Sequence, residues 1–287
     1  MKAPAFGYIA PLSLDEAFHY LHHTEHARIL AGGQSLVAML NMRLADPEYL
    51  IDISRIPDLA NIEERNDSIY FGAMTRQRDV EFSSLIKARL PLLHEAILQV
   101  GHRQTRNRGT IGGSLCQLDP SAEVPTVAMA MDARIHIGSV RGLREMDIAD
   151  FPAGYMTTAL AVDEMLTGLS ITPWSPKHGS CFIEYARRHG DFAIVSSAVL
   201  VQFGQDGRID RCSITIGGCE TAPVRMSQAE QVLMGSTGSD HAIQDASMLC
   251  SEIQASSDAY VSAWYRKKLA RSLTQRALNI AISRCTR

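Results

Sequence analysis

The N-terminal part of the chain alternates short apolar runs with stretches in which apolar residues recur at helical spacing. The predicted elements are strands over residues 6–8, 28–31 and 50–53 and helices over residues 13–21 and 36–43. Ser13 and Glu16 form a capping-box pattern at the start of the first helix. Because strands that are joined through a helix usually pair in parallel, this order predicts a small parallel lobe over residues 1–54.

The middle of the chain continues with mixed strand and helix patterns. Here we predict strands over 69–73, 135–137 and 165–171 and helices over 92–100 and 126–131. We also expect Thr75 to cap a helix that carries Val80. Together with the first lobe, these elements predict an N-terminal domain over residues 1–176, with a second lobe over about 55–176.

Past a turn-rich stretch at 173–180, strand patterns give way to helices. We predict antiparallel strands over 181–186, 196–203 and 209–217 and helices over 227–234, 241–251 and 258–284. Asp206 and Gly207 suit a hairpin turn. A basic run that begins at Arg266 is interpreted as a solvated helix face, with a subunit contact as the alternative. This C-terminal domain covers residues 177–287, and the fold class is α+β.

The composition and charge exclude several classes of function. The 287 residues are 46% hydrophobic and 21% charged, with a net charge of -3, which gives no electrostatic argument for nucleic acid or an anionic membrane. The sequence shows no signal-peptide pattern and no apolar run of membrane-spanning length, so we predict a cytoplasmic protein without a membrane span. None of the six cysteines forms a C-x-x-C pair, so neither an iron–sulfur cluster nor structural zinc is expected in this chain.

Two glycine-containing turns carry the candidate chemistry. The first, Ala31–Ser35, lies between a strand and a helix, and Ser35 suits the helix N-cap. The second turn is Thr110–Ser114. Backbone N–H groups at such turns bind phosphate, so the pair could hold a pyrophosphate from both sides; two ordinary surface turns are the alternative. Asp119 and Glu123 follow, either as acceptors for sugar hydroxyls or as acids at a helix start.

Several common catalytic motifs are missing from the sequence. There is no G-x-G-x-x-G, no G-x-x-x-x-G-K-[ST], no G-x-S-x-G and no H-E-x-x-H. The phosphate-holding turns therefore remain the strongest signal.

With both turns in view, the chain resembles the FAD-binding medium subunit of the molybdenum hydroxylases (the xanthine dehydrogenase and CO dehydrogenase family). The matching segments are Ala31–Ser35, Gly72–Thr75, Thr110–Ser114, Asp119–Pro125, Gly190–Ala193 and Tyr265–Leu278, in the family's order over nearly the whole chain. The resemblance implies a fold like that of vanillyl-alcohol oxidase and para-cresol methylhydroxylase. That fold has two N-terminal α+β lobes followed by an antiparallel sheet with helices.

The resemblance also implies which residues bind FAD. They are Ile29, Leu30, Ala31, Gly32, Gly33, Gln34, Ser35, Leu36, Thr110, Ile111, Gly112, Gly113, Ser114, Asp119, Glu123, Leu166, Asp191 and Phe192. The chain departs from some relatives at Glu184, where they carry lysine. Arg187 and Arg188 either supply positive charge near the flavin or form a surface pair. No residue of this chain is expected to act as a catalytic acid or base or as a metal ligand.

The function that the resemblance implies is electron transfer within a complex. A large molybdopterin subunit hydroxylates an aromatic N-heterocycle or similar substrate, with a quinoline or nicotine type as the expectation here. A small subunit with [2Fe-2S] clusters passes electrons to FAD on this chain. The assembly it suggests is a dimer of heterotrimers. The alternative is a self-sufficient flavoenzyme with a general base, for which His102, His178 and His189 are candidates; a binding module without flavin is a third reading.

Overall fold

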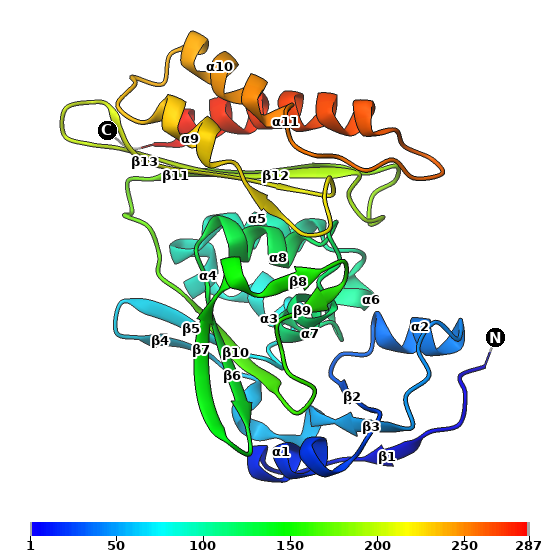
Figure 1. Cartoon of the computed structure of the whole chain (residues 1–287). Coiled ribbons are helices and arrows are strands. Elements are labelled where there is room, and N and C mark those ends of the chain that lie inside the picture. Colours follow the sequence, from blue (N-terminus) through cyan, green and yellow to red (C-terminus); the bar gives the residue numbers. More distant parts are fainter. Residues whose placement is uncertain (1, 286–287) are drawn as a thin grey trace.

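A computed structural model describes residues 2–285. The first group of helices and strands along the chain is built on a small parallel sheet (Figure 1). Strands lie in the order β1-β3-β2, and both neighbouring pairs are parallel, as predicted. The elements of this lobe are β1 (Gly7–Ile9), α1 (Leu14–His23), β2 (Ala27–Leu30), α2 (Leu36–Asn41) and β3 (Tyr49–Asp52). At the start of α1, the Ser13 hydroxyl accepts a hydrogen bond from the Glu16 N–H, while the Glu16 carboxylate accepts one from the N–H of Leu12.

The second group is built on a five-stranded antiparallel sheet with the order β4-β5-β10-β6-β7. Its strands are β4 (Ile62–Arg65), β5 (Ser68–Gly72), β6 (Arg134–Ser139), β7 (Gly142–Asp147) and β10 (Met165–Ile171), and a small ribbon pairs β8 (Pro152–Gly154) with β9 (Thr157–Thr158). The helices are α3 (Gln77–Phe82), α4 (Ser84–Arg89), α5 (Pro91–Gln99), α6 (Arg103–Arg106), α7 (Ile111–Gln117) and α8 (Glu123–Ala130). Three short 3-10 helices are η1 (Ile53–Arg55), η2 (Pro57–Leu59) and η3 (Ile148–Asp150).

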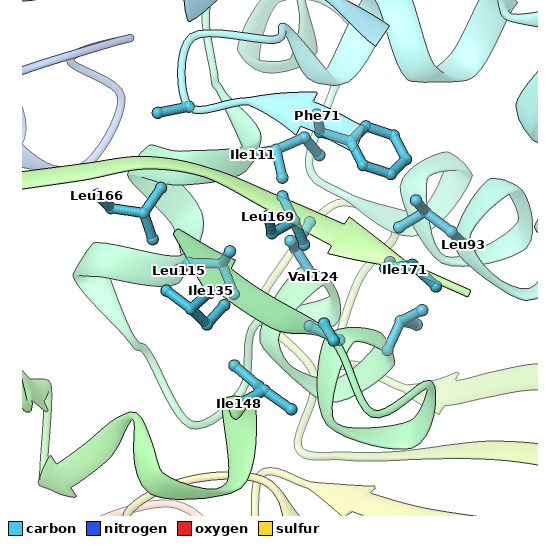
Figure 2. Close-up of a cluster of buried hydrophobic side chains, with 14 of the residues drawn as sticks. Phe71, Leu93, Ile111, Leu115, Val124, Ile135, Ile148, Leu166, Leu169 and Ile171 are labelled. Atoms are coloured by element: carbon cyan, nitrogen blue, oxygen red, sulfur yellow. The ribbon is translucent and has the colours of Figure 1, made fainter. Parts of the chain in front are cut away.

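The main hydrophobic core lies between this sheet and helices α5, α7 and α8 (Figure 2). Phe71 of β5 and Leu169 of β10 are almost fully buried against Ile111 and Leu115 of α7, with Val124 of α8 in the same cluster. Burying each such side chain contributes about 1.5–3 kcal/mol relative to leaving it exposed. The core therefore fixes the start of α7, and with it the second glycine turn, against the sheet.

The third group is a four-stranded antiparallel sheet with the order β11-β12-β13-β14. Its elements are β11 (Gly179–Tyr185), β12 (Val195–Phe203), β13 (Ile209–Gly217), β14 (Val224–Arg225), α9 (Ser227–Leu233), α10 (Asp240–Cys250) and α11 (Ala263–Arg284). Helices α9 and α11 lie against one face, with α10 packed on them, and α5 and α8 of the preceding group cover the other face (Figure 1). On β12, Val199 packs with the helical side while Ala198 and Leu200 pack into the main core.

The structure contradicts two details of the sequence reading. The Thr75 hydroxyl does not cap α3; it donates a hydrogen bond to the Asn61 carbonyl instead. Arg266 is not on a solvated face, since it is only 8% exposed and its guanidinium donates to the carbonyl oxygens of Ile194 and Gly218. Charge alone did not distinguish Arg266 from its solvated neighbours. No helix among residues 2–285 has the length and apolar character needed to cross a bilayer.

Candidate functional site

A large cavity of about 1250 Å³ opens where the parallel lobe meets the second group and the loop between β11 and β12. Most pockets for drug-sized ligands measure about 300–1,000 Å³, so this one has room for a dinucleotide. The cavity wall includes both glycine turns, the segment 155–166 between β8 and β10, and Gly190, Asp191 and Phe192 of the β11–β12 loop. Segments that are far apart in the sequence thus form one site.

The first turn touches the backbone of the two residues just before the second turn. A Cβ atom on Gly32 would overlap the Arg108 carbonyl, lying 2.8 Å from its carbon and 3.0 Å from the Cα of Gly109. Only glycine permits this approach. Gly33 has φ +73, a backbone conformation that side chains rarely adopt, and this turns the chain toward α2. Gly113 of the second turn is also close to the first turn, because a Cβ on Gly113 would lie 3.7 Å from the Ala31 Cβ.

The two turns do not offer the same hydrogen-bond donors. The backbone N–H groups of residues 33–36 have no acceptor within the described part of the chain. In the second turn, by contrast, the N–H of Gly112 donates to Ala73 O at 3.0 Å and the N–H of Gly113 donates to Thr110 Oγ1 at 3.0 Å. The free donors for an anion therefore come mainly from the first turn. Ser35 occupies the N-cap position of α2, as predicted, but it has helical backbone angles and its hydroxyl accepts no hydrogen bond from the helix.

A buried ion pair holds the loop that leads into the second turn. Arg106 donates to Glu81 from Nε at 2.9 Å and from Nη2 at 3.3 Å, and its Nη1 donates to Val100 O at 3.0 Å. The hydrogen bonds from Arg106 hold the pKa of Glu81 below its usual range. Because both side chains are largely buried, this pair fixes the path of residues 100–109.

The ion pair between Glu81 and Arg106 predicts that the free energy of unfolding depends on pH. A carboxyl whose folded pKa is depressed contributes stability above its unfolded pKa of about 4.5, and this contribution is lost as the pH falls through the folded value. We expect Glu81→Gln to lower the free energy of unfolding of the chain at neutral pH, and the difference from wild type to shrink below pH ~4.5. Urea unfolding at several pH values measures this. Glu252→Gln, at an exposed site, is the control; a difference that stays constant with pH would contradict the prediction.

Acidic side chains form another part of the cavity wall. Asp119 and Glu123 both line the cavity, and Glu123, the first residue of α8, is only 4% exposed. Burial raises the pKa of Glu123 to about 7, with a further increase from the nearby Asp119, whose own pKa is raised by burial. Asp119 Oδ1 accepts the N–H of Ser121 at 2.9 Å. These carboxyls are placed to accept hydrogen bonds from hydroxyl groups inside the cavity.

The structure brings together nearly all the residues that the resemblance implied. Every one of them lines the cavity except Leu30 and Ile111. Leu30 lies beneath Gly33, with a side-chain carbon 3.5 Å from the position of a Gly33 Cβ. Ile111 is 1% exposed and belongs to the hydrophobic core (Figure 2). These two residues support the turns from behind.

Sequence reasoning missed other residues of the cavity wall. Gln77 is 5% exposed, lines the cavity, and its Oε1 has no hydrogen-bond partner among the described residues. It lies two residues after the Gly72–Thr75 segment, which was the only available signal. The cavity is also lined by most residues of segment 155–165. A further part of the wall comes from residues 21–28, which run from the end of α1 into β2. They are polar or mixed in character and gave no motif.

The candidate bases and cations of the alternative readings lie elsewhere. His102, His178 and His189 are absent from the cavity wall. The Nδ1 of His178 is 2.6 Å from Ser175 O, and the rings of His102 and His189 lie 6.2 Å apart. Arg187 stacks over the Tyr260 ring, and Arg188 pairs at 3.6 Å with Asp191, which lines the cavity. Within residues 2–285, no cluster of His, Cys, Asp and Glu could hold a metal ion.

Comparison with known families identifies the family of the chain. Residues 4–174 match the family model described as the FAD binding domain in molybdopterin dehydrogenase, and residues 180–281 match the CO dehydrogenase flavoprotein C-terminal domain. The chain belongs to the FAD-binding medium subunits of the molybdenum hydroxylases. This membership confirms the resemblance read from the two turns, and it makes the chain an oxidoreductase subunit rather than a binding module.

Individual relatives of this medium-subunit chain cover it almost completely. It is 38% identical to the caffeine dehydrogenase subunit beta of Pseudomonas sp. (strain CBB1), over 99% of this chain and 97% of that one. It is 36% identical to the 6-hydroxypseudooxynicotine dehydrogenase complex subunit alpha of Paenarthrobacter nicotinovorans, with the same coverage. Its structure superimposes on a chain of carbon monoxide dehydrogenase from Hydrogenophaga pseudoflava with a TM-score of 0.97 at 33% identity, covering all of both chains.

Proposed function

We propose that FAD binds in the 1250 Å³ cavity, with its pyrophosphate against the first glycine turn. The single observation that carries this proposal is the set of four free backbone N–H groups at residues 33–36, which face no acceptor within the described chain. The second turn positions the first through the Gly32 contact. Glu123 and Asp119 accept hydrogen bonds from the sugar and ribityl hydroxyls. Leu166, Asp191 and Phe192 lie along the flavin.

The role of this chain is then to hold one redox group within a larger complex. Bound FAD accepts electrons from [2Fe-2S] clusters of a small partner subunit and passes them to an external acceptor. The chain's own residues bind and orient the cofactor and set the charge around it, and none needs to act on the substrate. A large molybdopterin subunit carries out the hydroxylation, and we propose a dimer of heterotrimers in the cytoplasm.

The substrate of the complex is an aromatic N-heterocycle in this proposal. Two relatives with more than 35% identity are named for caffeine and 6-hydroxypseudooxynicotine, both of which contain nitrogen heterocycles. The proposed architecture is the vanillyl-alcohol oxidase-like arrangement of two lobes, 1–54 and 55–176, and a C-terminal domain over 177–287. The ends of the two family matches, at residues 174 and 180, support this division.

A visible absorbance spectrum of the chain purified alone tests the cofactor, with the released flavin identified. We expect FAD close to one per chain. A colourless chain that does not take up added FAD would refute the proposal. Binding of FAD only after co-expression with a cluster-bearing partner would support the electron relay, whereas turnover of a small substrate by the isolated chain would favour a self-sufficient flavoenzyme.

A further inference from the structure

Behind the acidic wall of the cavity, the C-terminal sheet presents a buried polar patch to helix α8. Glu184 of β11 lies directly opposite Ser196 of β12, which in turn lies opposite Gly217 of β13. A Cβ on Gly217 would lie 2.5 Å from Thr126 Oγ1 and 2.6 Å from Ser196 Oγ. Thr126 is one helical turn after Glu123 on α8, so Glu123 faces the same region.

The polar atoms of this patch lack the partners that buried groups normally have. Ser196 is fully buried, and neither its Oγ nor the Oε2 of Glu184 has a hydrogen-bond partner within the described chain. The patch connects to the cavity through Glu123, which is 4% exposed and lines the cavity. A free serine hydroxyl beside a carboxyl can donate to it when the carboxyl is ionised.

The charges that act on Glu184 and Glu123 are negative. Burial, reinforced by the charge of Glu123, raises the pKa of Glu184 to about 8. On the loop before α8, the charge of Asp119 likewise raises the pKa of Glu123. Helix α5 packs against β11 and carries Glu95. The Glu95 carboxylate already accepts hydrogen bonds from the Phe182 N–H at 3.0 Å and from Arg284 Nη1 at 2.5 Å. No Lys, Arg or His nitrogen of residues 2–285 forms an ion pair with Asp119, Glu123 or Glu184, as the salt bridges of the chain lie elsewhere.

We propose that Glu123 and Glu184 form a proton-holding pair, which takes up a proton from solvent when electrons add negative charge to the bound flavin. The inference rests on the proposed function, which supplies those electrons. A proton from water in the cavity forms an O–H bond with a carboxylate oxygen of Glu123 and is shared with Glu184. No bond between heavy atoms changes, and one negative charge on the reduced cofactor is balanced by one proton on the pair. Glu184 does not line the cavity, so it acts through Glu123.

The physical reason is the absence of a compensating cation. A negative charge that arrives beside a carboxyl raises the pKa of that carboxyl and favours its protonated form. A proton on the pair neutralises the added charge, and it does so only when the cofactor is reduced.

The test counts protons taken up per flavin reduced, using FAD-loaded full-length chain, an indicator dye in weakly buffered solution, and a series of pH values. We expect wild type to take up more protons than Glu184→Gln near pH ~8, by at most about one per flavin. The excess should vanish at pH ~5, where both carboxyls are protonated in either redox state. Glu184→Asp should retain part of the excess, and Glu252→Gln should behave as wild type.

Equal uptake by wild type and Glu184→Gln over the whole pH range, with FAD near one per chain in both, would overturn the inference and leave the proposed function intact. A wild-type chain that binds no FAD would overturn both, and its spectrum distinguishes this case. In the FAD-free chain, an infrared band of a protonated carboxyl at neutral pH should be lost in Glu184→Gln. A Glu184→Gln chain that fails to fold also contradicts the inference, because an amide and a neutral carboxyl have nearly the same shape.

Discussion

Gly32→Ala is expected to abolish retention of FAD during purification, with a loss of affinity of at least about a hundredfold, or about 2.8 kcal/mol. The added Cβ would overlap the Arg108 carbonyl and lie 3.0 Å from the Gly109 Cα. Both neighbours are backbone atoms of the two residues just before the second turn, so no side-chain rotation can relieve the overlap. The two turns must move apart, and the free N–H groups at residues 33–36 move with the first turn.

The measurement is the ratio of flavin to protein absorbance, followed by titration of the variant with FAD. Gly154→Ala is the matched control, because its Cβ would meet only Thr157 Cβ at 3.8 Å, an ordinary contact. Gly112→Ala is a poorer test, since its Cβ would lie 2.6 Å from Ala73 O and 2.8 Å from Ala73 Cα, inside the folded core. FAD bound to Gly32→Ala as tightly as to wild type would show that the contact between the turns does not shape the site.

The glycine turns could be found in the sequence because their function requires a particular residue type. A strand, a break at Gly32 and Gly33 and a following helix leave a local pattern, and the prediction of a parallel lobe over residues 1–54 follows from the same periodicity. The parallel sheet and the β10 boundaries at Met165 and Ile171 were predicted correctly for this reason. The pattern did not show that only the first turn has free backbone N–H groups at residues 33–36. This difference arises because Ala73 O accepts the Gly112 N–H in the second turn.

Residues whose role depends on distant partners could not be predicted. Gln77 reaches the cavity because Gly109 lies beside it, with a Cβ there only 2.5 Å from Gln77 Oε1. The Glu184 carboxyl is significant only because β11 pairs with β12, which packs on α8, and this brings Glu184 near Glu123 from 61 positions earlier in the chain. Such pairings are made by the fold, and a single sequence carries no local signal for them.

Arg266→Met is expected to lower the free energy of unfolding by about 3 kcal/mol, because it leaves two backbone carbonyls without donors in a buried site. In the wild type, Nη1 donates to Ile194 O at 2.6 Å and to Gly218 O at 2.5 Å, and Nη2 pairs with Asp258. Most of the loss comes from the carbonyls. Asp258 is half exposed and keeps its hydrogen bonds from the N–H groups of Tyr260 and Val261.

The same substitution should also weaken FAD binding, because the arginine supports the cavity wall from behind. Gly218 donates its N–H to Pro120 O at 2.8 Å, and Pro120 adjoins Asp119, which lines the cavity. Ile194, the second carbonyl partner, ends the loop that carries Asp191 and Phe192. Urea unfolding and FAD titration measure the two effects, and Arg271→Met, which removes the same charge from an exposed position on α11, is the control. If Arg266→Met and Arg271→Met unfold at the same urea concentration, the buried arginine does not stabilise this domain, and its link to the cavity wall is refuted as well.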